Sequence, residues 1–157
     1  MTLEDVLAAA EARIRRYTPE EAHTAAAHGA RIVDIRSSDA RERHGAVSGG
    51  RHVPRTVLEW RVASSEWANP ELIGKRLILI CEHGLSSVLA ASALVDLGVD
   101  AGDIVGGFEG WRAAGLPTTG PTRFEGMPGM GPPTRPYGVP GASLVSWRGL
   151  PSRLARR

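Results

Sequence analysis

The only cysteine of the chain, Cys81, follows directly after the apolar run Leu-Ile-Leu-Ile at positions 77–80. A short loop that contains Gly84 comes next, and a helical pattern begins at Ser86. A buried strand that ends at a cysteine and leads through a turn into a helix places the sulfur beside free backbone N–H groups. Such groups favour the thiolate, which is the nucleophilic form of cysteine. The segment predicts covalent catalysis by Cys81, although taken alone it fits a small buried side chain equally well.

The other residues of the loop are candidates for holding an anion beside the sulfur. Gly84 permits a turn that a Cβ would hinder, and a hydroxyl of Ser86 or Ser87 is expected to cap the helix and donate to the anion. Glu82 would raise the pKa of the thiol if it lay close, so we expect it to face solvent. His83 is either a loop cation or an exposed side chain. The predicted active-site loop comprises Cys81, Glu82, His83, Gly84, Leu85, Ser86 and Ser87.

A single cysteine also excludes several kinds of chemistry. It rules out an intrachain disulfide, a redox Cys-x-x-Cys pair and a zinc site with several cysteines. We therefore expect no metal and no cofactor. A lone thiol used as a chemical group suits a reducing cytoplasm, where we expect the protein to reside.

The composition predicts one soluble globular domain. The chain has 157 residues, 42% of them hydrophobic and 23% charged. The apolar run that ends at Cys81 is too short to span a bilayer, and residues 1–16 lack the apolar core of a signal peptide. A protein embedded in or spanning a membrane is not expected.

The charge and the proline content change near residue 120. Residues 121–157 hold six of the 19 basic residues but one of the 17 acidic ones, together with seven of the eleven prolines. The remainder therefore carries 13 basic and 16 acidic residues, and it has no basic face of the kind that binds nucleic acid. We expect residues 119–157 to form a flexible, solvated tail; the alternatives are that its end docks on the main domain, on an acidic protein partner or on a membrane surface.

Helical and strand patterns alternate along the remainder of the chain. An amphipathic helix is expected over 2–16, before the main domain at 17–118. Alternation of this kind predicts an α/β fold with a mainly parallel central sheet flanked by helices. Within the main domain we expect helices over 18–29, 86–97 and 108–114, strands over 31–36, 51–53, 77–80 and 104–105, and one helical turn over 38–43.

In several ordered motifs the chain resembles the single-domain rhodaneses, which are thiosulfate sulfurtransferases with a three-layer fold. The resemblance covers about residues 17–118, including Cys-x-His-Gly-x-Ser-Ser at the loop. It implies that Cys81 takes a sulfur atom from a donor such as thiosulfate, becomes a persulfide and passes the sulfur to a thiol or to cyanide. The other motifs are Tyr-Thr-Pro-Glu-Glu-Ala at 17–22, Ile-Val-Asp-Ile-Arg at 32–36, Gly-Ala-Val-Ser-Gly-Gly-Arg-His-Val-Pro at 45–54, and Val-Gly-Gly-Phe-Glu-Gly-Trp at 105–111 with Gly-Leu-Pro at 115–117.

The loop departs from the family in one respect, because many rhodanese loops carry an arginine near the position of Ser86. Another arginine is therefore expected to supply positive charge near the loop, with Arg55 the first choice and Arg41 and Arg43 as alternatives. The family's Asp-x-Arg position is filled by Asp34 and Arg36. We expect this pair chiefly to brace neighbouring loops, with contact to substrate as the alternative.

Two other functions are compatible with parts of the pattern. The rhodanese fold also occurs in binding or regulatory modules without activity, which the missing loop arginine and the basic tail would suit. A phosphatase-like hydrolase is opposed by Ser87, which stands where a Cys-x5-Arg loop needs its arginine to hold the phosphoryl group.

Overall fold

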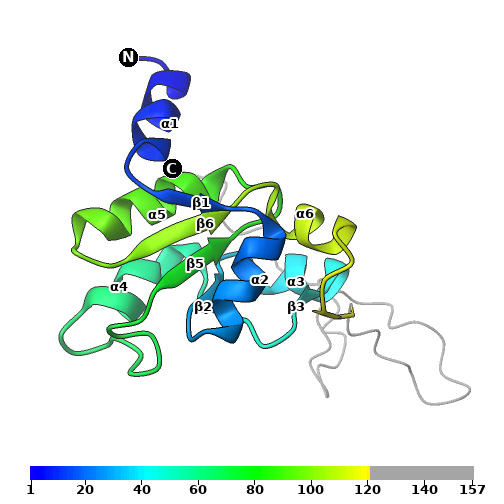
Figure 1. Cartoon of the computed structure of the whole chain (residues 1–157). Helices are drawn as coiled ribbons and strands as arrows, with labels where there is room; N and C mark the ends of the chain where they lie inside the picture. Colours follow the sequence, from blue (N-terminus) through cyan, green and yellow to red (C-terminus); the bar gives the residue numbers. More distant parts are fainter. Residues whose placement is uncertain (121–157) are drawn as a thin grey trace, which may run out of the picture. The chain divides into compact units, whose positions relative to one another are not determined.

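A five-stranded sheet in which every pair of neighbouring strands runs parallel forms the centre of the computed structural model, which describes residues 1–120 (Figure 1). A separate antiparallel pair joins β3 (Ala46–Val47) to β7 (Thr118–Thr119). The parallel sheet confirms the α/β class predicted from the alternating pattern. Its strands, in spatial order, are β1 (Arg15–Tyr17), β6 (Ala101–Ile104), β5 (Leu77–Ile80), β2 (Arg31–Asp34) and β4 (Arg51–His52).

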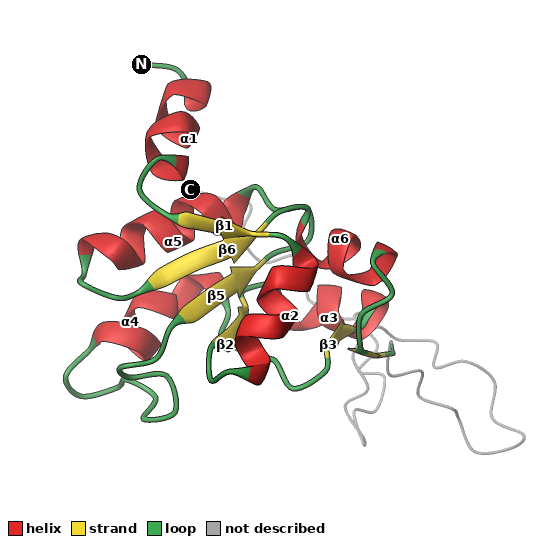
Figure 2. Cartoon of the chain, viewed as in Figure 1, coloured by secondary structure: helices red, strands yellow, loops and turns green. Residues whose placement is uncertain are grey.

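Helices cover both faces of this sheet, which gives the three layers that the motifs imply (Figure 2). One face packs against α4 (Leu58–Ala63) and α5 (Ser86–Asp96), and α1 (Leu3–Glu11) lies on α5. The other face packs against α2 (Pro19–Ala27) and α6 (Gly107–Ala113). The remaining elements are α3 (Ser38–His44) and the single 3₁₀ turn η1 (Arg55–Val57).

The central strand β5 is buried on both sides, as its unbroken apolar run predicts. Leu77 and Leu79 belong to the core beneath α4 and α5, and Cys81 continues this row. Ile78 and Ile80 belong to the core beneath α2 and α6. The strict alternation fixes the register of β5, because a slip of one residue would exchange the two cores.

The predicted helix over 2–16 is too long. A capping box between Thr2 and Asp5 starts α1 as expected, but the helix ends at Glu11. The chain then turns, and Arg15–Tyr17 forms β1 along the edge of β6. Pairing with a neighbouring strand and burial of Tyr17, which is 2% exposed, outweigh the helical spacing of the sequence.

Besides β1, four short elements were not expected from the sequence: η1, α4, β3 and β7. Thr119, which the composition assigns to the tail, pairs with Ala46 in the small sheet. Apart from Thr119 and Gly120, the flexible tail predicted for 119–157, and its docking on an acidic partner, lie outside the described residues. Within residues 1–120, no helix combines the length and the apolar character needed to cross a bilayer.

Candidate active site at Cys81

Cys81 stands where β5 ends, at the edge of the sheet at which all the parallel strands end. The backbone N–H of Gly84 donates to the Cys81 sulfur over 3.2 Å, and the Ser87 hydroxyl oxygen lies 3.3 Å from the same atom. The tight turn depends on glycine, since Gly84 has a φ of +79° and a Cβ there would lie 2.7 Å from the Gly106 nitrogen. The loop therefore encloses the sulfur with hydrogen-bond donors.

These donors determine the acidity of the thiol. Burial raises the pKa of Cys81, but hydrogen bonds from the hydroxyls of Ser87 and Ser86 and from the backbone N–H groups of Ser87 and Gly84 lower it. The second effect is larger, so the pKa of Cys81 lies below its ordinary value. The sulfur is thus arranged to exist as a thiolate more readily than a free cysteine does.

The backbone of the loop is held by the start of α6. The N–H of Phe108 donates to the carbonyl of Cys81 over 2.8 Å, and the N–H of Glu109 donates to the carbonyl of Glu82 over 3.2 Å. This approach requires Gly107, because a Cβ at that position would lie 2.5 Å from the Cys81 oxygen. The glycines of the Val-Gly-Gly-Phe motif therefore serve the cysteine loop.

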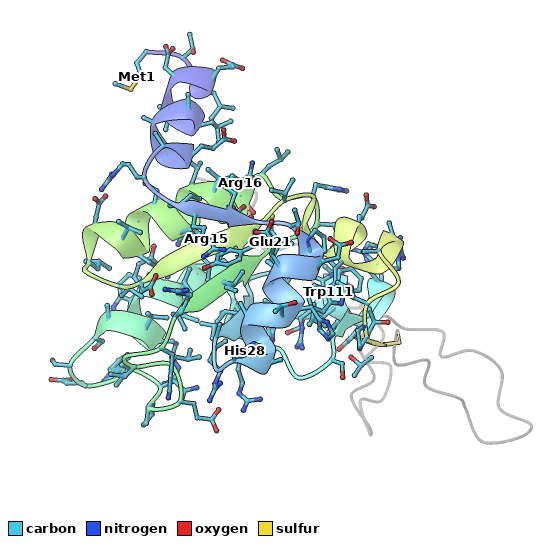
Figure 3. All side chains as sticks on the ribbon, in the orientation of Figure 1. Met1, Arg15, Arg16, Glu21, His28 and Trp111 are labelled. Carbon is cyan, nitrogen blue, oxygen red and sulfur yellow. The ribbon has the colours of Figure 1, made fainter. Side chains whose placement is uncertain are left out.

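Arg16 and Asp103 form an ion pair directly behind the loop, and neither was predicted as a site residue. The Arg16 guanidinium donates from Nε and Nη2 to the two carboxylate oxygens of Asp103, over 2.9 and 3.1 Å. It also donates to the carbonyl of Gly84 over 2.8 Å, while Asp103 accepts from the Ser87 hydroxyl over 2.8 Å. Asp103 is fully buried, and Arg16 reaches it from the edge strand β1 (labelled in Figure 3).

Arg36 joins three segments next to the loop. Its guanidinium donates to Asp34 from Nε and Nη2, to a carboxylate oxygen of Glu82 over 2.9 Å and to the carbonyl of Gly45 over 2.8 Å. It also stacks on the ring of Phe108 at 4.1 Å. Both Asp34 and Arg36 are buried. Within residues 1–120, the contacts of this pair join β2 to the segment after α3 and to the cysteine loop.

The expectation that Glu82 faces solvent is wrong. Its carboxylate accepts from Arg36 and lies 2.9 Å from the Nδ1 atom of His44, and its side chain is 22% exposed. The buried guanidinium attracts the carboxylate inward and compensates its charge. The neighbouring His83 is exposed, and its ring nitrogen lies 3.2 Å from a carboxylate oxygen of Glu109.

The arginines proposed as loop cations are occupied elsewhere. Arg55 pairs with Glu59 over 2.6 Å, Arg41 with Asp34 over 3.2 Å, and Arg43 with Asp39. Both Arg55 and Arg43 pair with an acid four positions away: Glu59 lies in α4, directly after η1, and Asp39 lies in the same helix as Arg43. The ion pair of Arg55, the first choice, is with Glu59, and the arginine whose guanidinium donates to the loop backbone is Arg16.

The two loop serines differ in their surroundings. The N-cap residue of α5 is Leu85, and no side chain caps the helix with a hydrogen bond, so the expected serine cap is wrong. Ser87 is fully buried, and its hydroxyl has hydrogen-bond partners in Asp103 and the Cys81 sulfur, whereas Ser86 is exposed. Leu85 is 65% exposed and gives the rim of the site an apolar edge. Among residues 1–120, no three His, Cys, Asp or Glu side chains are grouped to hold a metal ion.

Comparison with known proteins identifies the family of this chain. The family model "Rhodanese-like domain" matches residues 18–114. The thiosulfate sulfurtransferase GlpE of Stutzerimonas stutzeri is 38% identical over 99 residues, which cover 62% of this chain and 84% of that protein.

Solved structures agree with this assignment. A Rhodopseudomonas palustris protein of unknown function, described as a possible tyrosine phosphatase, is 33% identical with a TM-score of 0.70, covering 76% of this chain and 95% of that one. The polysulfide-sulfur transferase of Wolinella succinogenes shares the fold, with a TM-score of 0.62 at 22% identity over 79% of this chain and 91% of that one. The resemblance seen in the motifs is thereby confirmed: this chain belongs to the rhodanese-like domain family.

Proposed function

We propose that this protein is a sulfurtransferase that carries sulfur on Cys81 as a persulfide. The observation that carries the proposal is the set of polar groups around the Cys81 sulfur: the Gly84 N–H donates to it over 3.2 Å, and the Ser87 hydroxyl oxygen lies 3.3 Å away, where the hydroxyl can donate to a thiolate. These donors favour the thiolate, which is the form that attacks sulfur. The kinship with proteins named thiosulfate sulfurtransferase supports thiosulfate as the first donor to test.

In the first half-reaction, the Cys81 thiolate attacks the outer sulfur atom of thiosulfate. A new sulfur–sulfur bond forms to Cys81, and the original bond breaks so that sulfite leaves with its electron pair. The product is a persulfide with one negative charge on the terminal sulfur. Backbone N–H groups and hydroxyls at the start of α5 suit such a monoanion, which does not need a bidentate guanidinium.

In the second half-reaction, a thiolate or cyanide attacks the terminal sulfur. The bond to Cys81 breaks, and the enzyme sulfur leaves as the thiolate, which the same donors stabilise. No net oxidation or reduction of the enzyme takes place over the cycle. The exposed side chain of Leu85 at the rim favours an acceptor with some apolar surface over a small, highly charged one.

Mass spectrometry of the intact protein after treatment with thiosulfate tests the proposal. We expect an added mass of about 32 Da, one sulfur atom, that disappears on treatment with cyanide and is absent in Cys81→Ser. The matched control is Ser65→Ala, which removes an exposed hydroxyl outside the cysteine loop. Absence of the adduct with thiosulfate, polysulfide and organic persulfide donors would leave the binding-module alternative in its place.

Phosphatase activity is not the function that this loop supports. Phosphoryl transfer needs a guanidinium across the three equatorial oxygens, and that position is filled by the buried Ser87. Arg16 is held by Asp103 and the Gly84 carbonyl, so its donors do not replace the missing group. Turnover of p-nitrophenyl phosphate that depends on Cys81 would contradict this conclusion.

A further inference from the structure

The Ser87 hydroxyl lies between two groups that both attract its proton. Its oxygen is 3.3 Å from the Cys81 sulfur and 2.8 Å from a carboxylate oxygen of Asp103. A hydroxyl has a single proton to donate and can accept in addition. While Cys81 is a neutral thiol, both contacts are satisfied, because the S–H donates to the Ser87 oxygen and the hydroxyl donates to Asp103.

Ionisation of the sulfur removes one of these donors. The thiolate and the Ser87 oxygen then face each other with lone pairs unless the hydroxyl proton turns from Asp103 to the sulfur. The carboxylate can release that proton because Arg16 supplies two hydrogen bonds of its own to Asp103. Once the sulfur is bonded to a second sulfur, its charge moves outward and the hydroxyl can return to Asp103.

We propose that Arg16 and Asp103 are positioning residues that direct the Ser87 hydroxyl, toward Asp103 when the Cys81 sulfur is uncharged and toward the sulfur when it is an anion. The pair also holds the loop itself, since Arg16 donates to the carbonyl of Gly84, whose own N–H points at the sulfur. The inference rests on the proposed function for its use in the reaction cycle. Its direct consequence, the control of thiol ionisation, is measurable without sulfur transfer.

The charged groups around Cys81 single out this ion pair. From β1 and β6 come Arg16 and Asp103; the hydrogen bonds with Asp103 raise the pKa of Arg16, and negative charge on the Cys81 sulfur adds to this effect. Arg16 also pairs with Glu11 over 3.1 Å. Beside β2, Arg36 and Arg41 pair with Asp34, and Arg36 and His44 lie against Glu82; on the side of α6, His83 lies against Glu109. Of these acidic groups, Asp103 is the one that contacts the Ser87 hydroxyl. The first turn of α5 carries no acidic residue.

Arg16 and Asp103 carry opposite charges, so removing one or the other should have opposite effects on the stability of the Cys81 thiolate. In Asp103→Asn a negative charge and the stronger competitor for the Ser87 proton are lost, so the thiolate becomes more stable. In Arg16→Gln a positive charge is lost and Asp103 keeps its hold on the hydroxyl. If the pair served folding alone, both variants would be less stable, but the pKa of the Cys81 thiol would not change in opposite directions.

The experiment measures the rate of iodoacetamide alkylation of Cys81 against pH in the full-length protein. We expect Asp103→Asn to raise the thiolate fraction at pH 7 about three- to tenfold and Arg16→Gln to lower it by a similar factor. In the variant that carries both substitutions, the thiolate fraction should be close to that of the wild type. The control is Asp100→Asn, which breaks the exposed pair with Arg76 and should leave the profile unchanged. Shifts in the same direction, or no shift, overturn the proposal.

A second set of variants tests the part played by the hydroxyl. Ser87→Ala should lower the thiolate fraction at pH 7, and Asp103→Asn should have less than half its effect in that background. If Asp103→Asn has its full effect on the thiolate fraction without the Ser87 hydroxyl, the proposal that Asp103 acts through Ser87 is contradicted. If Asp103→Asn fails to fold, Ser87→Ala alone decides, because an unchanged profile in that variant overturns the proposal. If the variants shift the alkylation profile as expected but no donor produces a persulfide adduct, sulfur transfer is refuted and this inference stands.

Discussion

The backbone N–H of Phe108 donates to the carbonyl of Cys81 over 2.8 Å, so the start of α6 holds the candidate nucleophile by its own main chain. The contact brings together segments that are 27 positions apart in the sequence. It is possible only because Gly107, the preceding residue, has no side chain at the point of closest approach.

Replacing Gly107 by alanine should therefore be costly. The residue has a φ of +60°, and its new Cβ would lie 2.5 Å from the Cys81 oxygen. Backbone strain and the forced displacement of the loop together should lower the free energy of unfolding by about 3 kcal/mol, measured by urea denaturation. The matched control is Gly115→Ala, with a φ of +70° and open space, which should cost about 1 kcal/mol. Equal losses in both variants would contradict the argument.

Arg36 should be essential for stability. Its removal in Arg36→Gln leaves Asp34, which is 1% exposed, with a single ion pair to Arg41, and it releases Glu82 as well. Loss of one member of a buried ion pair costs about 3–5 kcal/mol. The control Arg43→Gln breaks an exposed pair with Asp39 and should cost no more than about 0.5 kcal/mol. Thermal unfolding of the two variants distinguishes them, and similar midpoints would speak against a bracing role for Arg36.

The lowered pKa of Cys81 predicts how stability depends on pH. Between the pKa of the folded protein and the higher pKa of the unfolded chain, the unfolded chain binds more protons, so stability relative to Cys81→Ala should rise with pH. The advantage is full above the unfolded pKa of about 8.5 and is lost as the pH falls through the folded pKa. Urea denaturation of both proteins at several pH values measures it. An advantage that shrinks as the pH rises would refute the lowered pKa.

Restoring an arginine to the loop should improve the use of thiosulfate. Ser86 is exposed, so Ser86→Arg adds a positive charge at the rim without filling the core. We expect the KM for thiosulfate to fall about three- to tenfold, with a dependence on salt that the present loop lacks. Ser86→Gln removes the same hydroxyl and adds length but no charge. An equal fall of KM in Ser86→Gln would exclude the electrostatic explanation.

Sequence patterns predicted the main architecture because its signals are local. The run at 77–80, the break at Gly84 and the helix after it each follow from residues a few positions apart, and together they place Cys81 at the end of a central strand. Unusual motifs such as Val-Gly-Gly-Phe at 105–108 supported the family assignment. Their physical purpose, the close approach of α6 to the loop, appears only in three dimensions.

The missed residues act over long separations. Arg16 was expected at the end of a helix, and Asp103 precedes a strand predicted to start one residue later. A lone carboxylate in the short segment Ala101–Ile104, which is buried throughout, was the available signal that it needed a partner. Nothing local in the sequence pairs it with an arginine 87 positions away. The position of the Glu82 side chain was mispredicted for the same reason, since its partner Arg36 follows a different strand, β2.

The donors that activate the sulfur are aligned by partners from both ends of the domain, because Arg16 reaches Gly84 across 68 positions of sequence. Contacts of such separation form late, since the entropy of closing a long loop must be overcome first. During synthesis and early folding, Cys81 therefore keeps the sluggish reactivity of a free cysteine. Full reactivity of the thiol therefore depends on the completed tertiary structure, and an unfolded chain presents the same cysteine without the contacts that lower its pKa.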